Sequence, residues 1–206
     1  MDLTTSGRFR VLESPRAPSK LLLVDVAPED PEAPDAYEPT VVDAAGYGEP
    51  LASTVADLEP GNVAEATLAW DAGTARFTDL SVVRRSVVAF ADDVTGVFEA
   101  ATETWEAAVA DGAGMNSRVT YDTDGEANGV LYVFAEQSGA RDVFEEFRTG
   151  ALPLEPLLAR VNQNHDAGER EVFVMRPVDH PFVLVYIALR KGGLLAETVR
   201  DTYDVG

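Results

Sequence analysis

The sequence contains no cysteine, two lysines and one isoleucine among its 206 residues. Without cysteine, the chain cannot form a disulfide, a thiolate nucleophile or a cysteine-ligated zinc or iron–sulfur site. Its longest apolar run, Phe182 to Leu189, is far shorter than the roughly 20 residues of a transmembrane helix. Residues 1–8 do not show a basic segment followed by an apolar one, so we expect no signal peptide. The expected protein is cytoplasmic and has no membrane partner.

What the sequence has in excess is acid. Aspartate and glutamate number 36 against 16 lysines and arginines, which gives a net charge of −20. Carboxylates hold water and ions, and molar salt shortens the Debye length to roughly 3 Å, so that their mutual repulsion is screened. We therefore interpret the acid excess as an adaptation to concentrated salt. The alternative is a specific acidic surface for a basic partner.

The charge is unevenly distributed near the start of the chain. Residues 1–20 carry four basic and two acidic residues, whereas residues 21–60 carry ten acidic residues and no basic one. This contrast indicates either an electrostatic match between neighbours in the fold or a basic strip for a polyanion. Residues 27–39 combine five acidic residues with four prolines, which predicts an exposed loop that is either mobile or functional.

The first half of the chain has the pattern of short strands. Strands are predicted at residues 8–12, 21–26, 40–42, 63–70 and 76–83. A turn signal at Pro60-Gly61 precedes the fourth strand, and a tight hairpin at 71–74 follows it. The stretch Leu58-Glu59-Pro60-Gly61-Asn62-Val63 resembles the OB-like small β-barrels. That resemblance implies an N-terminal barrel domain at residues 1–84.

The second half alternates strands with helices. Strands are predicted at residues 86–90, 118–121, 130–135, 171–175 and 182–189. One helix begins at Asp92 or Asp93 with Val109 on its apolar face, a second is capped by Ser138, and two more cover 157–161 and the region after Gly193. The order of these elements predicts an α+β domain at residues 85–206. Its expected form is a ferredoxin-like antiparallel sheet with helices on one face.

The turn Arg190-Lys191-Gly192-Gly193 between the last strand and the last helix is a candidate anion site. Glycines at a helix N-terminus leave amide groups open, the helix dipole favours an anion there, and two cations add to the attraction. The alternative is a flexible turn whose charges offset nearby acids.

The two histidines, His165 and His180, lie in polar segments on either side of the predicted strand at 171–175. That position places them at opposite ends of the strand. Each is a candidate general base if a carboxylate and a cleft lie nearby. The simpler interpretation is a histidine in a surface turn. Their spacing matches no metal motif, so we predict neither a metal site nor a cofactor.

Two further features of the sequence bear on nucleic-acid binding. Arg76, Arg84 and Arg85 could form a small basic patch near the predicted domain junction. Tyr132, in the predicted strand at 130–135, occupies one aromatic position of an RNA-recognition motif, but the other stacking positions hold valine and alanine. Tyr132 is therefore expected to be a core or sheet-face residue.

The composition, together with the stretches at 65–70 and 77–83, resembles small uncharacterised acidic proteins of halophilic archaea. This resemblance implies a setting and no catalytic residue. Our first hypothesis is a non-enzymatic binding or adaptor protein, with an unknown protein partner and a possible homodimer. The alternatives are an RNA- or ribonucleoprotein-associated factor, and a hydrolase-type enzyme that uses His165 or His180 as its base.

The salt interpretation makes a prediction about stability. We expect the melting temperature to fall when KCl is lowered from molar to millimolar concentration, because the carboxylates then repel one another without screening. Thermal unfolding followed by circular dichroism across a KCl series measures this directly. A melting temperature that is equal or higher in millimolar KCl contradicts the interpretation.

Overall fold

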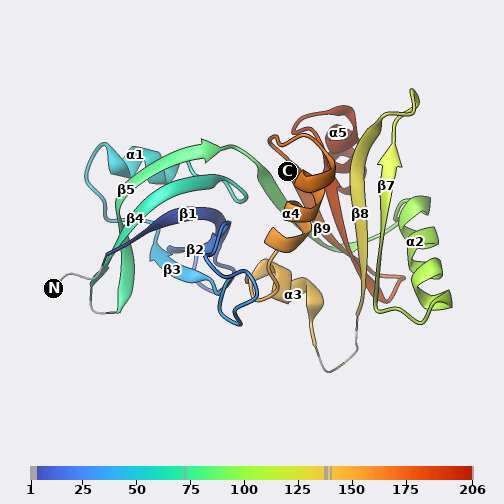
Figure 1. Cartoon of the computed structure of the whole chain (residues 1–206), viewed down its shortest axis with the longest axis horizontal. Helices are drawn as coiled ribbons and strands as arrows, with labels where there is room; N and C mark the ends of the chain where they lie inside the picture. Colours follow the sequence, from blue (N-terminus) through green and yellow to red (C-terminus); the bar gives the residue numbers. More distant parts are fainter. Residues whose placement is uncertain (1–3, 72, 137–138, 140, 206) are drawn as a thin grey trace. The chain divides into compact units, whose positions relative to one another are not determined.

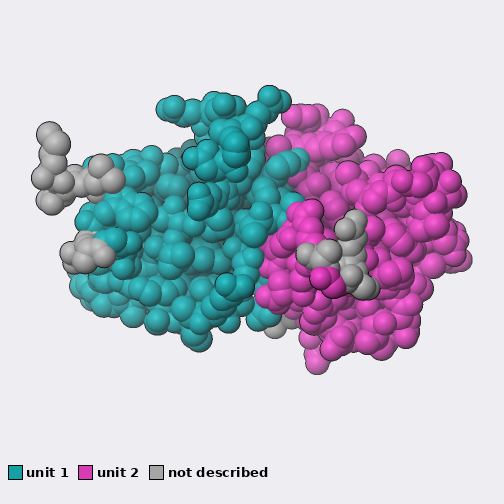
Figure 2. Space-filling view, turned by 90° about the horizontal axis from the view of Figure 1, so that it is seen from below, with its two compact units in different colours: residues 1–86, 147–156 teal, residues 87–146, 157–206 magenta. Residues whose placement is uncertain are grey.

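The chain forms two compact units in the computed structural model, which describes residues 4–71, 73–136, 139 and 141–205. The first unit contains residues 1–86 and 147–156, and the second contains residues 87–146 and 157–206 (Figure 2). The α+β class predicted from the sequence is confirmed, with one five-stranded sheet in each unit. None of the described helices is long and apolar enough to cross a membrane.

The first unit is a sheet that closes on itself (Figure 1). Its elements are β1 (Thr4–Glu13), β2 (Lys20–Asp25), β3 (Thr40–Asp43), α1 (Leu51–Ala56), β4 (Val63–Asp71) and β5 (Thr74–Arg84). The strands are ordered β1-β2-β3-β5-β4, and β4 pairs again with β1. All neighbours are antiparallel except β3 and β5, which run parallel.

Alternation along the strands fills the interior of this closed sheet. Phe9 and Val11 of β1, Leu68 of β4 and Phe77 of β5 point into one buried cluster, whereas Glu65 of β4 faces outward. Helix α1 was not predicted, because six residues are too few for a helical period to be recognised. It adds the buried Val55 to the same cluster.

Residues 147–156 belong to the first unit although they lie far along the chain. Gly150 has a positive φ of 73°, and an added Cβ there would lie 2.8 Å from Cγ of Pro39, so the close approach depends on glycine. Arg10 of β1 holds the end of the segment. Its Nε donates to Oε1 of Glu155 (2.5 Å), its Nη2 to Oε2 (3.2 Å) and its Nη1 to the carbonyl of Gly61 (2.8 Å).

The second unit contains a mixed sheet ordered β6-β9-β10-β8-β7. Its elements are β6 (Val87–Val94), α2 (Glu99–Ala110), β7 (Met115–Tyr121), β8 (Ala127–Ala135), β9 (Glu171–Pro177), β10 (Phe182–Ala188) and α5 (Leu194–Tyr203), with most of α3 (Val143–Arg148) and α4 (Glu155–Asn164). The last two residues of α3 and the first two of α4 belong to the segment 147–156 of the first unit. β6 is parallel to β9, and the other pairs are antiparallel. The prediction of a fully antiparallel sheet is therefore wrong at this edge. The connection between β6 and β9 is long enough to cross over the sheet, which a parallel pair requires.

Helices cover both faces of this sheet, so the prediction of helices on one face is also wrong. Ala101 of α2 and Val199 of α5 pack with Leu184 of β10 on the first face. The ring of Phe144 in α3 contacts the ring of Phe90 in β6 edge-on, with 6.1 Å between the ring centroids. Phe90 lies on the second face of the sheet, because the residues before and after it along β6 pack into the cluster on the first face. The physical reason is visible in β10, every residue of which is buried, as expected for a strand covered on both sides. The ferredoxin-like arrangement is not confirmed.

The start of α2 differs from the prediction. β6 continues to Val94, and the helix begins at Glu99 after Phe98, which makes no side-chain cap. Asp92 does not cap a helix, because its carboxylate binds Nε of Arg176 on the neighbouring strand at 2.6 Å. Val109, predicted on the apolar face of this helix, is exposed.

The predicted cap of the next helix, Ser138, lies outside the described residues. Just before α3, the carboxylate of Asp142 accepts the amide hydrogen of Glu145 at 2.9 Å. This is the hydrogen bond that an N-cap side chain makes.

Loss of the Arg10–Glu155 pair is expected to destabilise the first unit strongly. Both side chains are buried, and removing one partner of such a pair costs about 3–5 kcal/mol, because it leaves a buried charge without a counterion. We expect Arg10→Ala to lower the free energy of unfolding by that amount, and Arg10→Met combined with Glu155→Leu to restore most of it. Urea unfolding of the full chain in molar KCl measures both.

Arg8→Ala on the same strand is the matched control. The Arg8–Glu65 pair is about half exposed, with 54% of each side chain accessible, so its loss is expected to cost less than about 1 kcal/mol. Similar losses in Arg8→Ala and Arg10→Ala would contradict the assignment of a buried pair.

Candidate functional site

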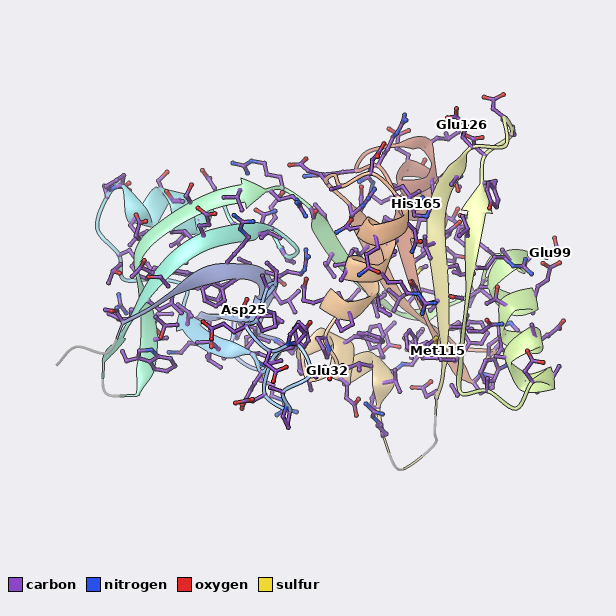
Figure 3. The ribbon with its side chains drawn as sticks, in the orientation of Figure 1. Asp25, Glu32, Glu99, Met115, Glu126 and His165 are labelled. Carbon is purple, nitrogen blue, oxygen red and sulfur yellow. The ribbon has the colours of Figure 1, made fainter. Side chains whose placement is uncertain are left out.

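One depression in the second unit is lined by candidate residues from two parts of the sequence. His165 precedes β9 in the chain, and Arg190 and Lys191 follow it. The volume of the depression is about 740 Å³, and its walls are the segment after α4 and the turn after β10. His165 lies just past the end of α4 (Figure 3). Side chains with polar chemistry that line the depression are His165, Asp166, Glu169, Arg170, Arg190 and Lys191.

The buried Arg170 fixes the frame of this depression. Its guanidinium donates to the carbonyl oxygens of Leu189 and Asp166 and to Oδ1 of Asn162, the last at 3.1 Å. These bonds connect the end of α4, the following segment and the end of β10. The backbone amide of Lys191 also donates to the carbonyl of Glu169 at 3.2 Å. The walls of the depression are therefore tied to one another by hydrogen bonds.

The glycine turn uses its amide groups inside the protein. The amide of Gly192 donates to Oε2 of Glu171 at 3.0 Å, and the amide of Gly193 donates to the carbonyl of Arg190 at 3.2 Å. Glu171 is 1% exposed, and Arg200 of α5 binds its other oxygen. A carboxylate of the chain itself thus occupies the place that the sequence suggested for an external anion. The side chains of Arg190 and Lys191 line the depression and are the cationic groups of this turn.

The charges lining the depression are mixed, with a small cationic excess. Arg170, Arg190 and Lys191 contribute three positive charges, and Asp166 and Glu169 contribute two negative ones. Within the part of the chain that the structure describes, the guanidinium of Arg190 makes no hydrogen bond or ion pair. A chain of net charge −20 therefore has a guanidinium here that its own carboxylates do not neutralise.

His180 lies at the other end of β9, in the turn before β10. Its ring stacks on Phe182 at a centroid distance of 5.4 Å. The structure therefore does not bring His165 and His180 together. Across the described ranges, no group of three or more histidine, aspartate and glutamate side chains is placed to hold a metal ion.

The predicted arginine patch is not assembled within the first unit. Arg76 donates to Asp43 (2.6 Å) and to the carbonyl of Gly46 (2.7 Å) and lies over the ring of Tyr47. Lys20 and Arg76 hold the pKa of Asp43 below its usual value. Arg84 is the last residue of β5, at the opposite end of the strand from Arg76, and Arg85 follows it.

Tyr132 is not available for stacking on a base. It is 2% exposed, and burial raises its pKa, which the nearby charge of Arg160 on α4 partly offsets. This tyrosine is a core residue on the face of the sheet that α3 and α4 cover.

Comparison with known proteins identifies a family but no activity. A family model described as a family of unknown function, DUF6663, matches residues 1–206. No curated protein matches the chain, and neither does any solved structure.

The Glu171–Arg200 pair is expected to support the turn that carries Arg190. Arg200→Ala leaves the Glu171 carboxylate buried without its cation and is expected to lower the free energy of unfolding by about 3 kcal/mol. Asp201→Ala, at the neighbouring exposed position, is the control and should change it by less than about 0.5 kcal/mol. Urea unfolding compares the two, and equal stability of both variants and the wild type would refute the supporting role.

Proposed function

We propose that this chain, which belongs to the family of unknown function DUF6663, is a non-enzymatic binding protein for a small anion. The proposal is based on the depression in the second unit. The ligand lies in the depression lined by His165, Arg190 and Lys191. The backbone amides of the glycine turn take no part, since they bind Glu171 and the carbonyl of Arg190.

The observation that carries this proposal is the state of Arg190. Arginines that form ion pairs with carboxylates elsewhere in the structure are Arg8, Arg10, Arg76, Arg118, Arg141, Arg176 and Arg200. Arg190 lines a depression instead, and no carboxylate among the described residues pairs with it. A guanidinium suits oxyanions because its fork of N–H donors matches the two oxygens of a carboxylate or phosphate.

The neighbouring groups favour a small anion over a nucleic acid. Asp166 and Glu169 line the same depression and would repel a chain of phosphates that extended past Arg190. Phosphate contacts along a polyanion also weaken steeply as salt rises. His165 adds an imidazole, which donates or accepts one hydrogen bond according to its protonation.

The topology of the first unit supports the OB-like interpretation as part of this proposal. Five strands close in the order β1-β2-β3-β5-β4, and the helix α1 lies between β3 and β4. OB-folds commonly bind oligonucleotides or oligosaccharides on the face of the second and third strands. Here residues 27–39, between those strands, carry five acidic residues, which disfavour a phosphate backbone. We therefore do not assign RNA binding to this sheet.

We also propose that the acid excess reflects a salt-rich cytoplasm. Among the described residues, the only buried carboxylates are Glu155 and Glu171, and each is paired with an arginine. The remaining described acidic side chains lie where they contact solvent, as expected for a solvent adaptation.

Binding of inorganic phosphate tests the function. We expect calorimetric titration of the full chain in molar KCl to detect a site for phosphate, and Arg190→Ala to weaken that site at least tenfold. Arg16→Ala removes the same charge from an exposed position in the first unit and is expected to bind as the wild type does. Absence of phosphate binding to the wild type, or equal binding by Arg190→Ala, would overturn the proposal.

A further inference from the structure

A smaller pocket adjoins the anion depression. Its volume is about 200 Å³, and three residues, Ala127, Leu189 and Arg190, line both spaces. Arg190 therefore stands at the border between them. The depression by itself has a volume within the range of roughly 300–1,000 Å³ that small-molecule sites usually have. A ligand held at Arg190 can therefore extend into the depression or into the smaller pocket.

Part of the lining of the smaller pocket is apolar. Leu194 and Leu195, the first residues of α5, line it together with Gly193. Leu195 is anchored, because it is packed against the buried cluster on the first face of the sheet. Gly129 of β8 leaves it the space, since an added Cβ there would lie 2.5 Å from Cδ2 of Leu195.

Leu194 is the open part of this wall. It is 77% exposed, more than any other large apolar side chain that the structure describes. A single exposed leucine is ordinary on a protein surface. Leu194, however, lines a pocket that shares a wall with a cationic depression, so a ligand placed there would cover it.

Another part of the lining of the smaller pocket is acidic. Asp122 and Glu126 line it, and Oδ1 of Asp122 accepts the amide hydrogens of Asp124 and Glu126, both at 2.9 Å. These carboxylates disfavour a second anionic group in the smaller pocket. The two spaces together therefore fit a molecule that is anionic at one end and uncharged at the other.

We propose that the ligand is an amphipathic anion. Its phosphate or carboxylate group lies beside Arg190 and Lys191, and its apolar group covers Leu194 and Leu195. This inference rests on the anion site proposed above and adds the chemical class of the ligand. Each methylene group that leaves water should increase affinity roughly fourfold, so an alkyl chain that covers Leu194 should bind considerably more tightly than the bare anion.

The test compares methyl phosphate with hexyl phosphate, which share the anionic group and differ in the apolar one. We expect calorimetric titration of the full chain in molar KCl to show that hexyl phosphate binds at least tenfold more tightly. Leu194→Ser is expected to reduce that advantage to less than threefold and to leave methyl phosphate binding unchanged. Serine is tolerated at the first position of a helix, and the side chain of Leu194 is exposed, so this variant is expected to fold.

Val109→Ser is the matched control, because Val109 is an exposed apolar residue of α2 (58% accessible) that does not line either space. It should retain the full advantage of hexyl phosphate. Equal binding of the two phosphates to the wild type overturns this inference and leaves the anion site standing. An advantage that survives in Leu194→Ser also overturns it. If neither phosphate binds, the anion site itself fails, and the ligand class fails with it.

Discussion

A carboxylate that leaves water needs a cation beside it, because transfer of an isolated charge into a protein interior is far too costly. This protein has 36 acidic residues and buries two of those that the structure describes, Glu155 and Glu171. Arg10 neutralises the first and Arg200 the second. Each pair lies within one unit and joins parts of it that are distant in sequence.

These two pairs add charged contacts to segments that are also held by buried apolar side chains. Arg10 connects the first strand of the closed sheet to the segment 147–156. This segment belongs to the first unit although it follows residues 87–146 of the second unit in the chain. Glu171 binds the turn after β10 through the amide of Gly192 and binds α5 through Arg200. The position of Arg190, and so of the proposed anion site, depends on this second pair.

The same charge balance bears on Arg190, which lines a depression and has no carboxylate partner among the described residues. In a protein with more than twice as many acidic as basic residues, one arginine can pair with several carboxylates, as Arg176 does with Asp92, Glu136 and Asp142. The segment that carries His165 is fixed by Arg170, whose guanidinium donates to two backbone carbonyls and to the side chain of Asn162. Arg170 therefore holds the walls of the depression together, and Arg190 lines it.

The sequence by itself determined the α+β class, most of the strands and the surface location of the acid excess, because period-two alternation and solvation act over a few neighbouring residues. The unbroken apolar run of β10 also indicates a strand covered on both faces, which the prediction of helices on one face does not accommodate. Only the tertiary structure decided that Asp92 binds Arg176 rather than capping α2, that Glu171 occupies the amide of Gly192, and that His165 and Arg190 line one depression. Those outcomes depend on contacts between residues that are distant in sequence. Local patterns of alternation and capping carry no information about which charged residue from another part of the chain will pair with a given side chain.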